Sequence, residues 1–145
     1  MKYQAAQAPM AESTMKPLRE ILGYDTDPVG YQQPYWVGRV AYLHDVGFAG
    51  ATACKQTLEA VGHCVVFGHT HRASLEYSGS TNGERWFALN CGWLGDAKHI
   101  VYMAPSKTRF WQQGLGVVDY VDGLAYARFI PFVKGKFYLD GHVYK

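Results

Sequence analysis

Apolar and polar residues follow a helical rhythm from residue 50 to residue 62. The apolar members recur at the i, i+4, i+7 spacing of one helix face, at Cys54, Leu58 and Val61. Residues 64–67 then form an unbroken apolar run, Cys-Val-Val-Phe, which ends at Gly68. A short apolar run closed by a glycine is typical of a buried strand. The pattern therefore predicts a helix over residues 50–62 and an interior strand directly after it.

A second apolar segment, residues 36–43, precedes the helix and predicts another strand, with His44 at its end. A strand, a helix and a strand joined by short turns predict a β-α-β unit with a right-handed crossover. The two strands of such a unit are parallel, so their carboxyl ends meet at one edge of the sheet. We therefore expect His44 and His69 at the same edge, where open α/β sheets place their ligand sites.

Downstream of Arg72 the pattern changes to short strands separated by turn signals, and it predicts two hairpins. The first has strands over residues 74–77 and 85–90 around residues 78–83, which end in Asn-Gly; the second has strands over residues 114–121 and 124–132 around Asp122-Gly123. Further turns are predicted at Lys134-Gly135 and Asp140-Gly141, and a mixture of loop and short strand over residues 93–107.

The first 35 residues have a different character. Residues 1–14 are rich in Ala and Gln with little periodicity, and we interpret them as mobile or as the lead-in to a helix. An early Pro and a closing Gly predict a short helix over residues 14–23, and two prolines predict a loop over residues 25–35. This divides the chain into a lead-in, residues 1–35, and a domain, residues 36–145.

Length and composition set broad limits. The chain has 145 residues, enough for one domain, and its net charge of +2 neither requires nor excludes a nucleic-acid partner. With 15% aromatic and 18% charged residues, we expect a well-filled core or a face that another chain covers. Three scattered cysteines favour reduced thiols, and neither a secretory signal nor a membrane-length apolar run occurs. We therefore expect a cytoplasmic protein.

The most informative motif follows the interior strand: Gly68-His69-Thr70-His71-Arg72. Imidazole is the commonest metal ligand in proteins and is largely neutral at pH 7. Two imidazoles spaced i, i+2 on one loop can converge on one ion or flank two. Gly68 is expected to allow a left-handed backbone or a close approach that a side chain would resist. The plainer interpretation is a turn with two solvated histidines.

Residues 65–72 resemble the G-H-x-H block of the calcineurin-like metallophosphoesterases. Residues 40–45 resemble that family's strand ending in an isolated metal-binding histidine, and residues 88–92, which end in Asn-Cys-Gly, resemble its N-x-G strand end. The resemblance extends over residues 37–92 and more loosely to the C-terminus. Within this family, the chain is similar to phosphoesterases encoded by bacteriophages. It implies an α/β fold, in which a β-α-β unit and antiparallel hairpins form the C-terminal half of a four-layer αββα sandwich.

The family holds two divalent metal ions, of manganese, iron, zinc or magnesium, spaced roughly 3.5–4 Å apart as in other two-metal sites. The resemblance assigns His44 and His69 to one ion and His71 to the other. Asp45 is expected to orient a histidine from behind, and Asn90 to support the loop rather than bind metal. The implied substrate is a phosphate ester, with nucleotides and nucleic acids among the candidates, in the host cytoplasm if a phage encodes the protein.

Cationic residues add weaker signals. The guanidinium fork of Arg72 suits phosphate oxygens, and an exposed salt bridge is an equal alternative. Lys107, Arg109 and Trp111 combine charge with an aromatic ring, as nucleic-acid surfaces do, but charged loop residues are common.

The family's N-terminal half has no counterpart before His44. That half carries D-x-H, then G-D-x-x-D with the bridging carboxylate, then G-N-H-[DE] with the acid histidine, so no catalytic residue can be assigned here. Asp140-Gly141-His142 spells D-x-H but falls on a predicted turn, and Gly95-Asp96 lacks an aspartate three positions on. We therefore interpret the chain as the C-terminal half of a two-metal phosphoesterase, which needs a second chain or segment for its aspartate ligands.

Two alternatives stay open. One is a mononuclear site of three histidines and a water molecule, a ligand set that catalytic zinc uses. The other is a non-catalytic remnant that binds a partner through an unpaired sheet edge. As a half-site, the isolated chain is expected to hydrolyse phosphoesters weakly, because three neutral imidazoles offer no negative charge to hold a second dication.

Overall fold

The computed structural model describes residues 20, 23, 29, 30, 33–79, 83–96, 99, 100, 103 and 105–145. The helix expected over residues 14–23 and the lead-in before it lie outside these residues, apart from positions 20 and 23, and so do residues 80–82 of the first predicted turn. The chain divides into two units, residues 1–30 and 31–145, and the fold below is that of the second unit.

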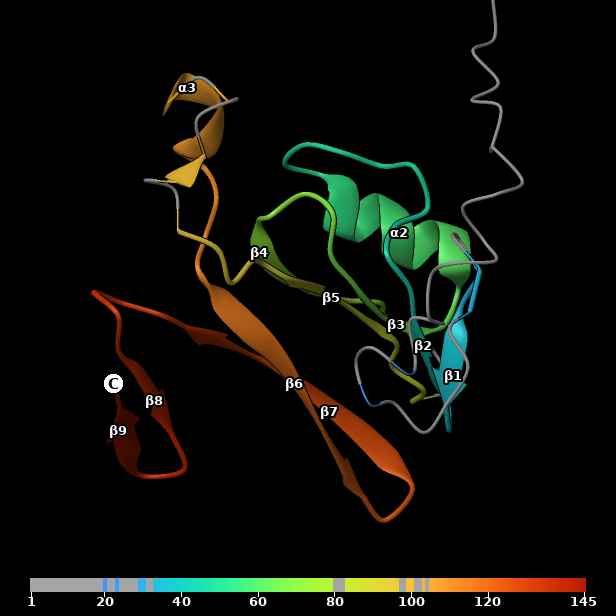
Figure 1. Cartoon of the computed structure of the whole chain (residues 1–145). Helices are drawn as coiled ribbons and strands as arrows, with labels where there is room; N and C mark the ends of the chain where they lie inside the picture. Colours follow the sequence, from blue (N-terminus) through green and yellow to red (C-terminus); the bar gives the residue numbers. More distant parts are fainter. Residues whose placement is uncertain are drawn as a thin grey trace, which may run out of the picture. The chain divides into compact units, whose positions relative to one another are not determined.

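A five-stranded mixed sheet forms the centre of this unit, in the order β1-β2-β3-β5-β4 (Figure 1). Its strands are β1 (Tyr35–Val37), β2 (Val40–Tyr42), β3 (Cys64–Phe67), β4 (Ala73–Tyr77) and β5 (Phe87–Cys91). The three inner strands are parallel to one another, and the two outer strands are antiparallel to their neighbours. The predicted α/β class is therefore confirmed.

The predicted β-α-β unit is present. Helix α2 (Ala53–Val61) connects β2 to β3, which pair in parallel with Tyr42 opposite Val66. Gly62 ends the helix with a left-handed φ of 66°, and its N–H donates to the carbonyl of Leu58 at 3.0 Å. Parallel pairing brings the ends of β2 and β3 to one edge of the sheet, as the pattern required.

The single strand predicted over residues 36–43 is wrong. Two antiparallel strands, β1 and β2, occupy that segment, and Val37 lies opposite Val40 across a turn at Gly38 and Arg39. Gly38 takes a φ of 56°, a left-handed conformation that an extended strand does not contain. Only Val40–Tyr42 leads into His44, and the three residues of β1 are exposed at the sheet edge.

Two cores lie on opposite faces of the sheet. On one face α2 packs over Val65 and Phe67, and on the other face β6 (Gly114–Val121) and β7 (Leu124–Pro131) pack over Cys64 and Val66. The strict alternation along β3, with all four residues buried, is what a sheet covered on both faces requires. The described residues thus form three layers, helix, sheet and hairpin, and the four-layer sandwich remains an expectation.

The predicted hairpins are confirmed in their described parts. Strands β4 and β5 pair antiparallel, and β6 and β7 close around Asp122-Gly123. The turn predicted at Asp140-Gly141 is also present, and it joins two further strands that the pattern did not predict, β8 (Phe137–Leu139) and β9 (His142–Tyr144). The segment expected as loop and short strand over residues 93–107 also contains a short helix, α3 (Pro105–Thr108). Its leading proline is a helix-start signal that the prediction missed. In the described part of the chain, no helix is both long and apolar enough to pass through a membrane.

Gly92, after β5, is the glycine that the fold needs near the Gly-His-Thr-His motif. Its φ is 67°, and a Cβ there would lie 2.6 Å from the carbonyl oxygen of Gln112. Gly68 meets neither expectation: its φ is outside the left-handed region, and a Cβ would meet open space. The left-handed positions of the motif are instead His69 and His71.

We therefore expect Gly92→Ala to lower the free energy of unfolding by about 2–4 kcal/mol, from left-handed strain and steric overlap together. Gly68→Ala is the matched control and should cost less than about 1 kcal/mol. Urea unfolding followed by circular dichroism measures both. Equal losses in the two variants would show that the close approach at Gly92 does not constrain the fold.

Candidate metal centre

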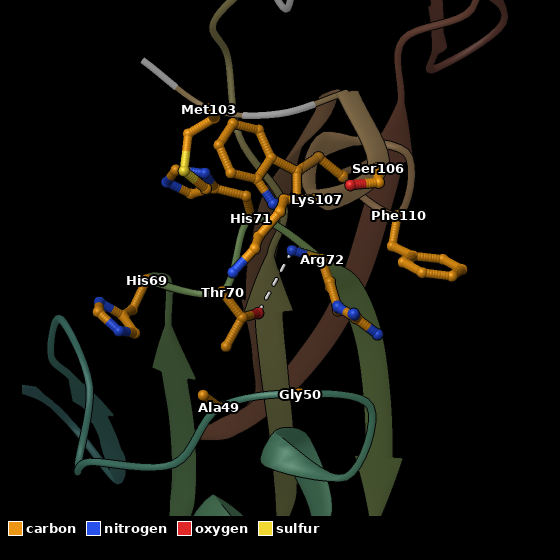
Figure 2. A pocket seen from close by; sticks show the side chains of 11 residues that line it. Ala49, Gly50, His69, Thr70, His71, Arg72, Met103, Ser106, Lys107 and Phe110 are labelled. Atoms are coloured by element: carbon orange, nitrogen blue, oxygen red, sulfur yellow. Dashed lines mark hydrogen bonds between the residues drawn. The ribbon is translucent and has the colours of Figure 1, made fainter. Parts of the chain in front are cut away.

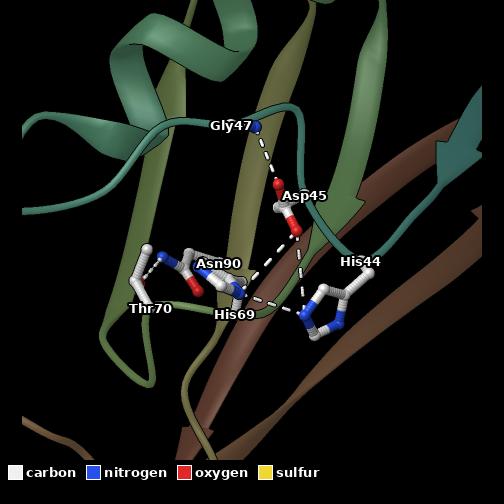
Figure 3. A network of polar contacts seen from close by, with 6 residues as sticks. All are labelled: His44, Asp45, Gly47, His69, Thr70 and Asn90. Atoms are coloured by element: carbon white, nitrogen blue, oxygen red, sulfur yellow. Dashed lines mark hydrogen bonds and ion pairs between the residues drawn. The ribbon is translucent and has the colours of Figure 1, made fainter. Parts of the chain in front are cut away.

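Three donor atoms converge where β2 and β3 end: Nε2 of His44, Oδ2 of Asp45 and Nδ1 of His69 (Figure 3). The two imidazole nitrogens are 3.1 Å apart, and each lies 3.7 Å from the carboxylate oxygen. A point equidistant from these atoms is about 2 Å from each, which is the length of zinc–nitrogen and zinc–oxygen bonds. The donor set and its spacing fit one divalent ion.

Asp45 is buried, with 3% of its surface exposed, and its carboxylate is oriented. The N–H of Gly47 donates to Oδ1 at 2.7 Å, which leaves Oδ2 directed at the two histidines (Figure 3). A buried carboxylate is costly unless hydrogen bonds or opposite charge compensate it. The sequence placed Asp45 behind the histidines, whereas the structure puts its Oδ2 atom among their donor atoms.

Hydrogen bonds between backbone groups bring the histidines together. The N–H of Gly68 donates to the carbonyl of His44 at 3.1 Å, which continues the pairing of β2 and β3 beyond the strands. The N–H of Thr70 then donates to the carbonyl of Gly68 at 2.8 Å, which closes a tight turn around His69. His69 and His71 have φ values of 69° and 58°, an uncommon conformation for residues with a side chain. Such strain is often found at functional sites.

Asn90, on β5, supports this turn from the buried side. Its side-chain N–H donates to the hydroxyl of Thr70 at 2.6 Å, and the same hydroxyl accepts the N–H of Arg72 at 3.3 Å. Asn90 is 1% exposed and lies outside the three-donor group. These contacts are those of a residue that holds the loop in place.

His71 lies apart from the three donor atoms. Its ring stacks on Trp93, with centroids 5.4 Å apart, and meets the edge of Trp111 at 4.3 Å. Its Nδ1 is buried and has no hydrogen-bond partner among the described residues. Burial, followed by the nearby His69 and His44, lowers the pKa of His71 below its ordinary value. The imidazole is therefore held neutral, as a metal ligand must be.

A cavity of about 580 Å³ opens beside His69 (Figure 2). The described residues that line it include no carboxylate; they are Ala49, Gly50, His69, Thr70, His71, Arg72, Met103, Ser106, Lys107, Phe110 and Trp111. Two of them are cations, and the guanidinium of Arg72 lies 4.9 Å from the ring centre of Phe110. In the described part of the chain, no ion pair is recorded for Arg72 or Lys107. Lys107 and Trp111 stand out in the sequence by their mix of charge and aromatic character, whereas no local motif marks Phe110 or Trp93.

Comparison with known proteins adds one relative. No family model matches the chain. A stretch of 98 residues, 66% of this chain, is 26% identical to the Gene 54 protein of Mycobacterium phage D29 and spans 38% of that protein. The name of the relative describes no activity. The similarity therefore indicates a phage relative, and any inference about function depends on the site.

The ligand set leads to a prediction about metal binding. We expect Zn²⁺, titrated into the metal-free chain by calorimetry, to bind with one site. Replacing a direct ligand, in His44→Ala or Asp45→Asn, should weaken binding by at least about 100-fold, the upper range for residues that only support a ligand. His71→Ala and the exposed control His99→Ala should retain the affinity of the unsubstituted chain. A large loss in His71→Ala would place that residue, contrary to this geometry, among the ligands of the first ion.

The environment of His71 leads to a prediction about pH. In the metal-free chain, its imidazole should titrate below 6.5, and Trp111→Leu should bring the midpoint back toward that value by reducing burial. The unfolded chain binds this proton more readily than the folded chain does, so the lowered pKa of His71 makes the free energy of unfolding depend on pH. The stability that the neutral imidazole contributes is fully present above pH 6.5 and is lost as the pH falls toward the folded pKa. Nuclear magnetic resonance titration of the ring protons measures the midpoint. A midpoint at or above 6.5 would contradict the buried environment.

Proposed function

We propose that this chain carries the histidine side of a divalent-metal phosphoesterase site and hydrolyses phosphate esters when further carboxylates complete it. The observation that carries the proposal is the convergence of His44, Asp45 and His69 with ion-binding spacing at the ends of two parallel strands. Open α/β sheets bind their ligands at this edge. The motif order, a strand ending in histidine, a helix, and a strand ending in Gly-His-Thr-His, supports the calcineurin-like family as the source of the chemistry.

Charge is the reason that the site needs completion. Asp45 is the one carboxylate in the three-donor group found among the described residues. Two dications about 4 Å apart repel each other strongly, and carboxylate ligands normally offset that repulsion. We propose that His71 serves the second ion only when another chain or segment brings such carboxylates. Edge strand β1, with three exposed residues, offers a place where a complementing chain can pair.

The chain's own residues have defined tasks in this proposal. Arg72 and Lys107 attract and orient the phosphate group, and the guanidinium fork can contact two of its oxygens. The ring of His71, which stacks on Trp93 and makes an edge contact with Trp111, lines the cavity and is kept neutral by burial. When bound, divalent ions supply Lewis-acid activation of the phosphoryl group and of water. The acid histidine of the family is absent, so protonation of the leaving group must come from elsewhere.

A single-ion hydrolase is the second candidate, and the same geometry favours it. Two histidines and one carboxylate are a ligand set of catalytic zinc, with the fourth position left to water. This set differs from the three histidines expected from sequence, because Asp45 takes the place of His71. The two candidates differ in outcome: a complete single-ion site is active in the isolated chain, whereas a half-site is not.

Hydrolysis of bis-p-nitrophenyl phosphate with added Mn²⁺ tests the proposal. For a half-site, we expect the isolated chain to bind one ion and to show weak or no turnover, because the clamp of a second ion and an acid worth about 10²–10⁴-fold in rate are both missing. Any residual turnover should disappear in His69→Ala and persist in the exposed control His99→Ala.

The remaining outcomes are informative in different ways. One ion per chain with strong turnover that His69→Ala abolishes would replace the half-site with the single-ion hydrolase. Two ions per isolated chain would mean that a carboxylate dismissed in the sequence analysis, at Asp96 or Asp140, is a ligand. A chain that binds no divalent ion at micromolar concentrations would contradict both candidates.

A further inference from the structure

The cavity beside the candidate metal centre is lined by both cationic and aromatic side chains. Lys107, on α3, extends toward the loop that carries Thr70, as Figure 2 shows, and Arg72 follows that loop directly. Phe110 and Trp111 come from the segment after α3. Charged groups and flat apolar surface therefore line one space.

Among the described residues, no carboxylate balances the positive charge in this space. No Asp or Glu lines the cavity, and no ion pair is recorded for Arg72 or Lys107 within the described residues. Elsewhere, Arg39 pairs with Glu84 at 3.2 Å and Arg128 with Asp119 at 2.9 Å, so cations of this chain with a carboxylate in reach do pair. Two unpaired cations beside a candidate metal centre favour an anionic ligand.

The aromatic side chains of the cavity favour a ligand that has a flat ring as well as a negative charge. Phe110 is 45% exposed, and the guanidiniums of Arg72 and Arg109 lie 4.9 and 4.5 Å from its ring centre. Exposed aromatic rings combined with planar guanidiniums are the surfaces on which proteins stack nucleobases. A phosphate ester of an aliphatic alcohol would use the cations and offer no flat group to stack on the guanidiniums and the exposed part of the ring.

We propose that the cavity binds a nucleoside phosphate, with the phosphate between Arg72 and Lys107 and the base against Phe110. A cavity of about 580 Å³ lies in the range of sites for single small ligands, which favours a mononucleotide over a longer strand. The phosphate would then face His69, the residue shared by the cavity and the three-donor group. The inference names a substrate class and so rests on the proposed function for its hydrolysis, although binding of the nucleotide does not require the metal.

Calorimetric titration of the full chain in EDTA tests the base and the phosphate separately. The ligands are adenosine 5′-monophosphate, ribose 5-phosphate and adenosine. If the base stacks, the nucleotide should bind roughly 5- to 100-fold more tightly than ribose 5-phosphate. Adenosine, which has no phosphate, should bind more weakly than the nucleotide. Equal affinities for the nucleotide and ribose 5-phosphate would overturn the proposal.

Paired variants assign the two contacts. Phe110→Leu should remove most of the preference for the nucleotide over ribose 5-phosphate, and the control Tyr126→Leu, an exposed aromatic on β7, should keep it. Lys107→Gln should weaken both phosphate ligands alike, and Lys55→Gln, on the exposed side of α2, should weaken neither. Circular dichroism confirms that each variant is folded. A folded Phe110→Leu variant with the full preference would overturn the placement of the base.

A further ligand distinguishes the source of the nucleoside phosphate. A 5′-phosphorylated tetranucleotide should bind no more tightly than the mononucleotide, and much tighter binding would overturn the mononucleotide in favour of a single strand. Failure here is separable from failure of the proposed function. Nucleotide binding without metal-dependent hydrolysis contradicts the phosphoesterase alone, and hydrolysis without preference for a base contradicts this inference alone.

Discussion

The parallel pairing of β2 with β3 continues past both strands, and the candidate site depends on that continuation. Leu43 N–H donates to the carbonyl of Val66, and Gly68 N–H donates to that of His44, each at 3.1 Å. These bonds fix the two chain segments side by side at the residues where each strand becomes a loop. Residues 25 positions apart in sequence thereby place imidazole nitrogens 3.1 Å apart. Without this register, the Gly-His-Thr-His turn would be an ordinary loop.

A second set of hydrogen bonds connects the loop that carries His69 and His71 to the segment that carries Phe110 and Trp111 and lines the cavity. Gln112 donates its N–H to the carbonyl of His71 at 2.9 Å and accepts the N–H of Ala73 on its side-chain oxygen at 2.8 Å. Phe110 and Trp111 precede Gln112 directly in the chain. Shared hydrogen bonds therefore hold the histidine loop and the aromatic segment together. A ligand that contacts the aromatic segment would lie at a fixed distance from the histidine loop.

Local pattern was sufficient for much of this arrangement. The apolar stripe of residues 50–62, the run at 64–67 and the Asp-Gly turns each act over a few residues, and each predicted element formed. Three features escaped: two depend on residues that only folding brings together, and the third depends on the backbone conformation of one glycine, which the apolar pattern does not mark. The hydrogen bond from Gly47 orients Asp45 toward His44 and His69, two residues that only folding brings together. The packing of His71 comes from Trp93 and Trp111, which are distant in sequence. The break in residues 36–43 comes from Gly38, whose φ is positive.

Electrostatics relates the candidate metal centre to the cavity beside it. Asp45 contributes one negative charge to the three-donor group, so one divalent ion there leaves a local excess of positive charge. Arg72 and Lys107 add to that excess, and no carboxylate in the described part of the chain lines the cavity to reduce it. Two kinds of group can restore the balance: carboxylates from another chain, or the phosphate of a ligand. The two are complementary, because carboxylates would hold a second ion and the phosphate would meet the cations of the cavity. A site that is short of negative charge in both respects is what a phosphate-binding half of a two-metal centre would present.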